Sequence, residues 1–575
     1  MWFPTRIHSH YSLLQSTLKP KRIVEICKDL GYKTAALTDF ASVSGAVKFV
    51  QECEKNDIKP ILGCEIPLKT SNNTTITLIC KNEKGWGKLL EIVSACNDAD
   101  NFKKHPAIPI DQLFELVDDN FICIDGYVGS ALFNELVEDN KCIYSCSEYD
   151  EAGKCLKREY SKDAVVHIAT FREKFGDDYY LEINKLDSET FAATKLVSNC
   201  IDEVADSIGF KNLIAGANIY YGEMADSKDH RILLCSKMRT TLNKVNKDLL
   251  KEDNYRHVRY FKSNSYYIPS KEEVETYSKE QIKAVGEINE KCSDYTILTS
   301  PRLPQVETKS DSQIEELKQI CRDGWKNILM PTGKVKDPKN IEIYKDRIVQ
   351  ELDVIEDADL SGYFLIVADY VNEFRRRGVL VGPGRGSAAG CLISYLMAIT
   401  LIDPIEYGLI FSRFFNSARK GSLPDIDIDF PPDQRENVIT YLKEKYGHNR
   451  VCQMLTFGRL QGRSALKEVL RVNESCSFEQ MNDITNKIPQ EAAISDKLEE
   501  MDEPSVIRWA LENDPDTLRE YCWEEDGELQ GDFAREFAQA LRIEGTFKSQ
   551  GKHAAGVVVS SIDLNNLCPM VKETR

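Results

Sequence analysis

Three aspartates alternate with apolar residues in the segment PDIDIDF, residues 424–430. On a strand, residues two apart point to the same face, so Asp425, Asp427 and Asp429 would share one face and the apolar residues the other. Carboxylates this close repel one another unless cations lie between them, and their hard oxygens suit Mg²⁺ or Mn²⁺. The segment therefore predicts an acidic strand that holds divalent cations.

A glycine-rich turn, GPGRGS at residues 382–387, precedes an apolar run that is expected to be helical. Backbone N–H groups at the start of a helix bind phosphate oxygens. The turn is not a Walker A loop, because no Gly-Lys-Ser/Thr follows it. Together with the acidic strand, it indicates phosphoryl or nucleotidyl transfer assisted by metal ions.

Both patterns also have plainer explanations. An alternating acidic strand occurs as a solvated edge strand, and glycines before a helix occur as ordinary turn residues. The acidic segment is not an EF-hand loop, since the Gly and the final Glu of that loop are missing at their positions. From these residues alone, the catalytic and the structural interpretations both stay open.

Longer motifs around these residues carry a family resemblance. The chain contains YFLIVAD (363–369), GPGRGSAAG (382–390), IDP (402–404), PDIDIDF (424–430), TFG (456–458) and HAAGVV (553–558). In this order and spacing the motifs resemble the palm of the bacterial DNA polymerase III alpha subunit, the C-family replicative polymerase. The resemblance implies a polymerase-beta-like nucleotidyltransferase palm of the α+β class. Its implied activity is that of a DNA-directed DNA polymerase in DNA replication, which adds dNMP to a primer 3′-OH.

The resemblance also implies roles for individual residues. Asp427 and Asp429 match two of the family's three catalytic aspartates and would hold two Mg²⁺ ions, with Asp425 as a supporting carboxylate. The implied nucleotide-binding residues are Gly384, Arg385, Gly386, Ser387, Arg435, Arg463 and Lys467. The implied DNA-binding residues are Arg459, Arg471, Lys548, Lys552 and His553.

Four of these basic residues recur every four positions: Arg459, Arg463, Lys467 and Arg471. On a helix, this spacing makes one continuous basic stripe. Such a stripe is often just a solvated face. In a net acidic chain and beside a metal site, it favours contacts with phosphates instead.

The first part of the chain alternates helical and strand patterns. Residues 23–31 and 45–55 are expected to be helices, and residues 34–38 and 59–66 are expected to be strands. This rhythm predicts an α/β barrel-like domain. The stretches FPTRIHSHYSLL, ALTDFASVSGAVKF and KPILGCEI resemble the polymerase and histidinol phosphatase (PHP) domain at the start of alpha subunits.

Active PHP domains bind metal ions through His, Asp, Glu and Cys side chains. By resemblance, His8, His10 and Glu65 remain of that ligand set, with the two histidines expected on one face of a first strand. Other ligand positions hold Gln15, Phe40, Thr75, Asn218 and Tyr220. Amide, phenyl, hydroxyl and phenol groups are poor ligands for divalent metals. We therefore expect a vestigial site in a domain that serves as a scaffold and does not hydrolyse phosphoesters.

The resemblance predicts four parts along the chain. They are a PHP domain at 1–265, a connector and palm at 266–458, a helical thumb at 459–542 and a return to the palm at 543–575. The family's third catalytic aspartate lies in a K-x-D-F-L-G motif after HAAG, which this sequence does not contain. We expect the chain to be incomplete as a polymerase and to work with a downstream polypeptide that carries this motif and the fingers.

Composition limits the alternatives. The 575 residues are 42% hydrophobic and carry a net charge of −18, so contacts with primer–template DNA and dNTPs must come from local basic patches. Apolar segments are too short for a membrane span, no signal peptide is evident, and a cytoplasmic location is expected. Two other interpretations remain: a PHP-type metal phosphoesterase, and a non-catalytic DNA-binding or assembly fragment.

Overall fold

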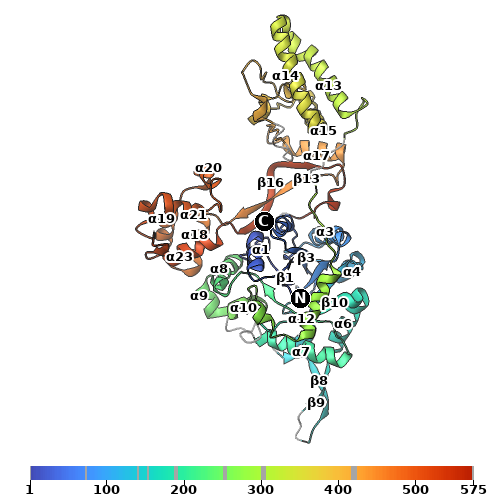
Figure 1. The fold of residues 1–575 in the computed structure, drawn as a ribbon, viewed down its shortest axis with the longest axis vertical. Coiled ribbons are helices and arrows are strands. Elements are labelled where there is room, and N and C mark those ends of the chain that lie inside the picture. Colours follow the sequence, from blue (N-terminus) through green and yellow to red (C-terminus); the bar gives the residue numbers. More distant parts are fainter. Residues whose placement is uncertain are drawn as a thin grey trace. The chain divides into compact units, whose positions relative to one another are not determined.

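A computed structural model describes residues 2–70, 74–138, 141–151, 155–186, 192–249, 255–299, 306–415 and 424–572. No helix within these ranges is long and apolar enough to cross a membrane. The chain divides into two compact units. Unit 1 contains Met1–Leu298, Leu455–Lys552 and Leu567–Arg575, and unit 2 contains Thr299–Met454 and His553–Asn566. Two paired strands, β13 (Val451–Arg459) and β16 (Phe547–Val559), each contain residues of both units (Figure 1).

Unit 1 is built on a six-stranded mixed sheet in the order β11-β10-β5-β4-β3-β2. Its strands are β2 (Thr34–Leu37), β3 (Lys59–Pro67), β4 (Thr75–Cys80), β5 (Phe121–Asp125), β10 (Tyr179–Ile183) and β11 (Leu213–Ala215). Only β4 runs antiparallel to its neighbours. Beyond β2, Thr38 N donates to Ile7 O of β1 (Arg6–Ile7), and β1 pairs with β12 (Asn218–Ile219). The sheet therefore curls, as expected of an α/β barrel-like domain.

Helices flank these strands in the rhythm expected from the sequence. They include α1 (Pro20–Asp29), α2 (Ala46–Lys55), α3 (Glu83–Asn97), α4 (Ile110–Leu116), α6 (Lys162–Phe175), α7 (Ala192–Ile208) and α12 (Lys279–Lys291). The expected helices at 23–31 and 45–55 are confirmed as α1 and α2, and the expected strands as β2 and β3. Helix α1 begins three positions early because Pro20 occupies its first turn, where no backbone N–H is needed.

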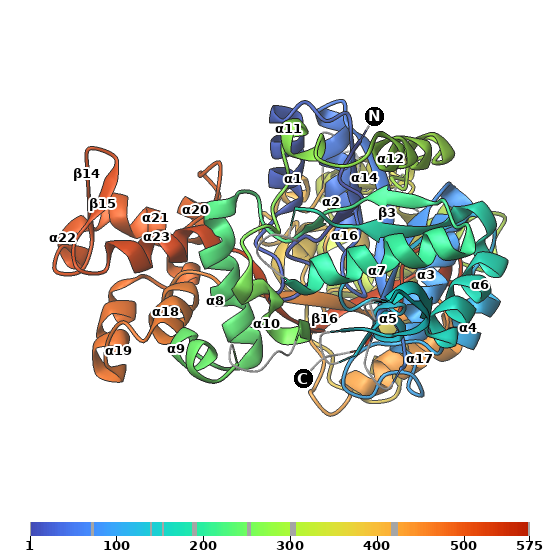
Figure 2. The same ribbon diagram turned by 90° about the horizontal axis from the view of Figure 1, so that it is seen from below.

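A second core of unit 1 joins α8 (Ser227–Met238) to the helical segment expected as the thumb. That segment contains α18 (Arg463–Asn473), α19 (Phe478–Lys487), α21 (Val506–Asn513) and α23 (Ala534–Ile543). Leu466 of α18 and Phe537 of α23 are fully buried in one apolar cluster with Leu233 of α8. Arg542 donates to the buried carboxylate of Asp229 at 2.5 and 3.1 Å. Figure 2 shows α8, α18 and α23 as neighbours.

Unit 2 is mainly helical. Its principal helices are α13 (Gln313–Gly324), α14 (Pro338–Asp357), α15 (Ser361–Arg376), α16 (Leu392–Leu396) and α17 (Arg435–Tyr446). The sequence predicts a helix at 363–377 with Phe364, Val367, Val371 and Phe374 on one face. All four are buried on α15, which confirms that prediction.

Helices α13 and α16 approach each other closely at Gly324. A Cβ added there would lie 1.9 Å from the carbonyl oxygen of Leu396, which is backbone and has little freedom to move. The absence of a side chain at this position is therefore a packing requirement rather than a matter of backbone conformation.

We expect Gly324→Ala to destabilise unit 2 by about 1–3 kcal/mol, because the added methyl forces the two helices apart. The matched control is Gly87→Ala in α3, where an added Cβ meets nothing within 4 Å. There the change should stabilise by roughly 0.5–1 kcal/mol, since alanine loses less backbone entropy in a helix. Calorimetric unfolding of both variants is the measurement. Equal shifts in the two transitions would contradict the close approach.

Candidate functional site

The glycine-rich turn of unit 2 contains two positions that exclude side chains. Gly384 and Gly386 have φ angles of 118° and 65°, in the region that favours glycine. A Cβ on Gly384 would also lie 2.8 Å from the side chain of Thr400. Gly386–Gly390 then form a 3-10 helix, η7, whose first N–H groups have no acceptor within the helix.

The α-helix that follows the turn is already capped from within the protein. The buried carboxylate of Glu351 on α14 accepts from Leu392 N at 3.0 Å and from Ile393 N at 2.9 Å. Burial raises the pKa of Glu351, although these donors and Arg347 oppose the shift. The start of α16 is therefore already occupied, and the backbone donors beside the turn that stay available are those that begin η7.

The acidic segment is extended, but among the described residues it forms no strand ladder. Gly382 N donates to Asp429 O at 2.9 Å, and Ile426 N donates to the Tyr363 hydroxyl at 3.2 Å. Ile426 is buried, whereas Asp425 and Asp429 are exposed. The expected alternation of faces is thus present, but the expected strand is wrong, because the segment packs against α15 rather than against another strand.

Asp427 and Asp429 meet at one guanidinium. Asp427 Oδ1 lies 3.6 Å from Arg385 Nη2, and Asp429 Oδ1 lies 3.8 Å from Arg385 Nε. A Cβ on Gly386 would lie 3.6 Å from Asp427 Oδ2, so the turn and the carboxylate are direct neighbours. All three charged side chains are more than 40% exposed. The structure therefore brings together Asp427, Asp429, Arg385 and Gly386 from the residues singled out by sequence.

The donor set at this site fits a hard divalent cation. In the described part of the chain, no group of three or more His, Cys, Asp or Glu side chains could hold a metal ion. Mg²⁺, however, commonly keeps several waters and is bound by one or two carboxylates together with substrate phosphates. Asp427 and Asp429 supply carboxylates of that kind, and Asp425 is exposed on the same segment.

Arg435 and His553 are brought together within unit 2. Arg435, the first residue of α17, donates to the carbonyl oxygen of His553 at 3.4 Å. The His553 ring accepts at Nδ1 from Ala555 N at 3.1 Å and from Gly556 N at 2.5 Å. The ring is therefore an acceptor at Nδ1, which fixes its tautomer and holds the local backbone.

The predicted basic stripe is not a single helix face. Arg459 ends β13, and α18 begins only at Arg463, so the regular spacing is interrupted between them. Arg463 donates to the carbonyl oxygens of Ile488 and Asn486, at 2.5 and 3.3 Å. Arg471 is paired with Glu468 at 2.6 Å. The prediction of one continuous stripe is wrong, because the turn at Gly462 separates the strand from the helix.

Lys467 and Lys548 line one cavity of about 320 Å³ in unit 1. The other lining residues are Leu14, Ser236, Leu460, Ser464, Glu468 and Ser549. Glu468 already pairs with Arg471 and accepts from Ser236 at 2.7 Å. Lys467 Nζ also donates to Asn482 Oδ1 at 3.0 Å. The hollow thus offers an anion such as a phosphate two ammonium groups, one of them already hydrogen-bonded, and several hydroxyls. Lys552, by contrast, is exposed on β16.

The buried interior of the barrel-like domain contains the charged side chain of Arg6. The fully buried guanidinium of Arg6 donates to both oxygens of Glu182, at 3.0 and 3.1 Å, and lies 3.9 Å from Glu65. Its central carbon lies 3.5 Å from the ring centroid of Tyr127. Burial alone would lower the pKa of Arg6, but Glu182, Tyr127 and Glu65 raise it above its ordinary value.

His8 and His10 have different partners inside the domain. His8 Nε2 lies 2.6 Å from Glu65 Oε2. Burial raises the pKa of Glu65, but His8 and Arg6 outweigh this effect and lower the pKa to about 2. His10 instead stacks on Phe547, with ring centroids 4.2 Å apart. Burial, followed by repulsion from Lys19 and Arg459, lowers the pKa of His10 to about 3. The expected pairing on a first strand is wrong, because β1 ends at Ile7.

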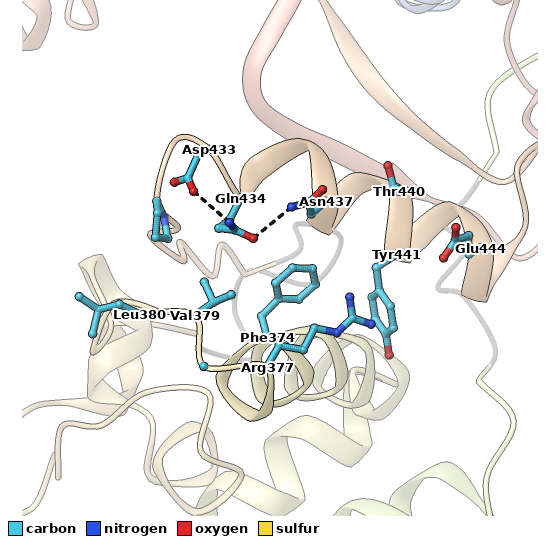
Figure 3. A pocket seen from close by; sticks show the side chains of 12 residues that line it. Phe374, Arg377, Val379, Leu380, Asp433, Gln434, Asn437, Thr440, Tyr441 and Glu444 are labelled. Carbon is cyan, nitrogen blue, oxygen red and sulfur yellow. Dashed lines mark hydrogen bonds between the residues drawn. The ribbon is translucent and has the colours of Figure 1, made fainter.

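A separate cavity of about 690 Å³ lies between the end of α15 and α17 (Figure 3). Arg377 sits there over the rings of Phe374 and Tyr441, at 5.0 and 5.3 Å. Asp433, Gln434 and Asn437 form a hydrogen-bonded series along its other side. None of the site residues expected from the sequence is among the residues that line this cavity. Its lining residue Pro431, however, lies only two positions after Asp429.

Sequence reasoning missed Arg6, Glu182 and Glu351. Arg6 stands two positions before His8, so strand alternation could have placed both side chains on one face. Glu351 lies on the buried side of α14 with Tyr344 and Ile355, where an acidic residue signals an internal partner. Glu182 has no such signal, since β10 is buried along its whole length.

Comparisons with known proteins cover most of the chain. Residues 315–575 match the family described as the bacterial DNA polymerase III alpha NTPase domain, and residues 4–186 match the PHP domain. A solved amidohydrolase from Chromobacterium violaceum aligns with 38% of this chain and 88% of its own, at 10% identity and a TM-score of 0.23.

Curated relatives align with nearly the whole chain. A DNA polymerase III subunit alpha from Borreliella burgdorferi is 30% identical over 99% of this chain and 45% of its own length. Those from Aquifex aeolicus and Rickettsia bellii are 29% and 28% identical over 98% and 99% of this chain, and 48% and 46% of theirs. The chain thus spans about half the length of the relatives it matches. By these matches the chain carries a PHP domain at residues 4–186 and the bacterial DNA polymerase III alpha NTPase domain at residues 315–575, and it is similar over nearly its whole length to DNA polymerase III alpha subunits.

Proposed function

We propose that this chain takes part in template-directed DNA synthesis, as the portion of a C-family replicative polymerase that binds the triphosphate and the catalytic metal ions. The observation that carries the proposal is the meeting of Asp427 and Asp429 at Arg385, beside the turn that contains Gly386. The substrates are a primer–template DNA and dNTPs, and the reaction takes place in the cytoplasm.

In this proposal, the chain's residues act by binding and orientation. The N–H groups that begin η7, at Gly386 and Ser387, bind the triphosphate oxygens of the incoming nucleotide. The Arg385 guanidinium, which is weakly held between exposed carboxylates, is free to pair with a phosphate when nucleotide arrives. Arg435, at the start of α17, adds a further cation in the same unit.

Asp427 and Asp429 would hold two Mg²⁺ ions, with Asp425 in support. When bound, such ions neutralise the charge that develops on the transferring phosphoryl group and lower the pKa of the primer hydroxyl. Two carboxylates are fewer than the three that the family's motifs imply. We therefore include a third carboxylate from a further polypeptide segment, which carries the K-x-D-F-L-G motif and the fingers.

DNA contacts are assigned to unit 1 and to the paired strands. Lys467 and Lys548, which share one cavity, are the first choice for a backbone phosphate. Exposed Lys552 on β16 and exposed Arg459 on the paired strand β13 extend the contact. Arg463 donates to a backbone carbonyl oxygen, and Arg471 donates to another carbonyl oxygen and to Glu468. We therefore assign these two arginines to the stability of α18 rather than to DNA binding.

The PHP domain is proposed to act as a scaffold. Its interior contains a paired guanidinium and a carboxylate bound by His8, so the residues present do not fit a metal cluster. The phosphoesterase interpretation would require Glu65 and His8 to release each other and Arg6 to leave the interior. No observation favours that second function.

We expect Asp427→Asn and Asp429→Asn each to lower the rate of nucleotide incorporation by about 10²–10³-fold, because each removes a charged metal ligand. Asp425→Asn, on the same exposed segment, is the matched control and should cost less than about tenfold. Single-turnover primer extension measures this, with the chain alone and with a polypeptide that adds the K-x-D-F-L-G segment. Equal rates for all three variants would contradict the assignment.

We expect Lys467→Ala and Lys548→Ala each to weaken binding of primer–template DNA and to reduce the salt slope of log Kd by about one. The reason is that each lysine releases a counterion when it meets a phosphate. Fluorescence anisotropy across a KCl series is the measurement. Lys487→Ala, an exposed lysine at the end of α19, serves as the control and should leave the slope unchanged.

We expect Arg6→Met to destabilise unit 1 by about 3–5 kcal/mol, because Glu182 and Glu65 would be left buried without a cation. Arg22→Met, a half-exposed arginine of the same unit, should cost less than about 0.5 kcal/mol. Thermal unfolding is measured with EDTA, with Mn²⁺ and with neither. A fall in the unfolding midpoint of the unchanged chain on adding EDTA would show that a metal ion, not Arg6, supports the domain.

A further inference from the structure

Arg375 and Arg376 end α15 and Arg377 caps it, and the structure gives each of the three arginines a different environment. Arg376 is exposed and pairs with Glu373 at 2.8 Å. Arg377 lines the cavity beside α17 and also pairs with Glu373, at 2.9 Å. Arg375 is partly buried and has no carboxylate partner among the residues that the structure describes. Its guanidinium donates hydrogen bonds to backbone carbonyl oxygens instead.

The guanidinium of Arg375 joins two chain segments that are distant in sequence. Its Nη2 donates to Gly382 O and to Ile399 O, both at 3.2 Å, and its Nη1 donates to Ala398 O. Within the described ranges, Arg375 is the only donor found for these three carbonyls. Ala398 has a φ of 55°, which is unusual for a residue with a side chain, so its carbonyl is turned into place at some cost.

One of the two segments that Arg375 joins is the start of the glycine-rich turn, and the other packs against that turn. Gly382 O accepts from Arg375, and Gly382 N donates to Asp429 O at 2.9 Å. The same residue is therefore hydrogen-bonded to Arg375 and to the backbone of the acidic segment. One residue later, Leu401 N donates to Pro383 O at 2.7 Å. Thr400 then packs where a Cβ of Gly384 would lie. Gly382 therefore links Arg375 to both the turn and the backbone of Asp429.

From this arrangement we propose that Arg375 is a positioning residue for nucleotide incorporation, which sets the phosphate-binding turn and the Asp429 carboxylate in register with each other. The proposal rests on the proposed function of that site. Arg375 touches neither substrate nor metal ion in this scheme, because three of its N–H groups bond to the carbonyl oxygens of Gly382, Ala398 and Ile399.

An arginine suits this position better than a lysine does. A guanidinium presents several N–H groups in one rigid plane, so it reaches carbonyls on two segments at once and fixes the angle between them. A lysine offers one compact ammonium on a flexible stem. Arg375→Lys should therefore keep the charge and part of the hydrogen bonding, but lose the fixed geometry.

We test the inference with Arg375→Ala, Arg375→Lys and the matched control Arg376→Ala, made in the same chain. Primer extension with varied dNTP gives kcat and KM separately. Because misplacement by about 1 Å can cost about 10²-fold in rate, we expect Arg375→Ala to lose roughly that factor in kcat/KM, with both a higher KM and a lower kcat. Arg375→Lys should lie between, and Arg376→Ala should stay within about twofold of the unchanged chain.

Two further readouts separate positioning from general loss of stability. Millimolar guanidinium, well below denaturing concentrations, should restore part of the activity of Arg375→Ala and none to any variant that has merely unfolded. Hydrogen–deuterium exchange of the peptide covering 381–386 should rise in Arg375→Lys and not in Arg376→Ala, since the Gly382 amide loses its fixed acceptor. If Arg375→Ala does not fold, Arg375→Lys carries the test.

The outcome that overturns the inference is agreement between Arg375→Lys and Arg376→Ala in kcat, KM and exchange. If the unchanged chain, supplied with the K-x-D-F-L-G segment, incorporates no nucleotide, the proposed function fails. In that case, faster exchange over 381–386 still shows that Arg375 holds the turn, whereas unchanged exchange rejects this role as well. The two failures are thereby distinguished.

Discussion

Repulsion between Asp427 and Asp429 is the constraint on which the candidate site of unit 2 depends. The single guanidinium of Arg385 lies 3.6 Å from one carboxylate and 3.8 Å from the other, and all three groups are exposed. Exposed ion pairs contribute only about 0–1 kcal/mol each, so Arg385 offsets the repulsion without fixing the carboxylates in place. Their position must come from the backbone, through the bonds of Gly382 to Asp429 and of Ile426 to Tyr363.

The glycines of the turn follow from the same requirement. A Cβ on Gly382 would lie only 3.1 Å from Asp429 Cβ, so the turn approaches the acidic segment closely there. At Gly386 the requirement is the backbone conformation, because its φ of 65° favours glycine. The capping of α16 by Glu351 removes a competing anion site, because that helix start is already neutralised. What remains open to a phosphate is the short stretch of N–H groups next to the carboxylates.

Sequence reasoning located the motifs and the helices α1, α2 and α15, because amphipathic spacing and glycine turns are local signals. It placed α15 and its buried face correctly. Sequence reasoning failed where the conformation of a residue depends on a contact that is distant in the sequence. An alternating acidic segment looks like a strand whether or not another strand pairs with it, and β16 determines the packing of His10 through Phe547. Arg375 and Arg376 are identical neighbours in sequence, and only the fold shows that one of them holds backbone carbonyls.

The two units use paired carboxylates in opposite ways, and burial explains the difference. In unit 1, Arg6 and Glu182 are fully enclosed, so removing either partner would leave an uncompensated charge at a cost of several kcal/mol. A cation so held does not exchange, and Glu65 is further committed to His8. In unit 2 the Arg385 pairs are open to water, so phosphate or a divalent cation can displace them at little cost. A carboxylate pair thus becomes a scaffold where its cation is internal and desolvated, and a candidate binding site where its cation is exposed and replaceable.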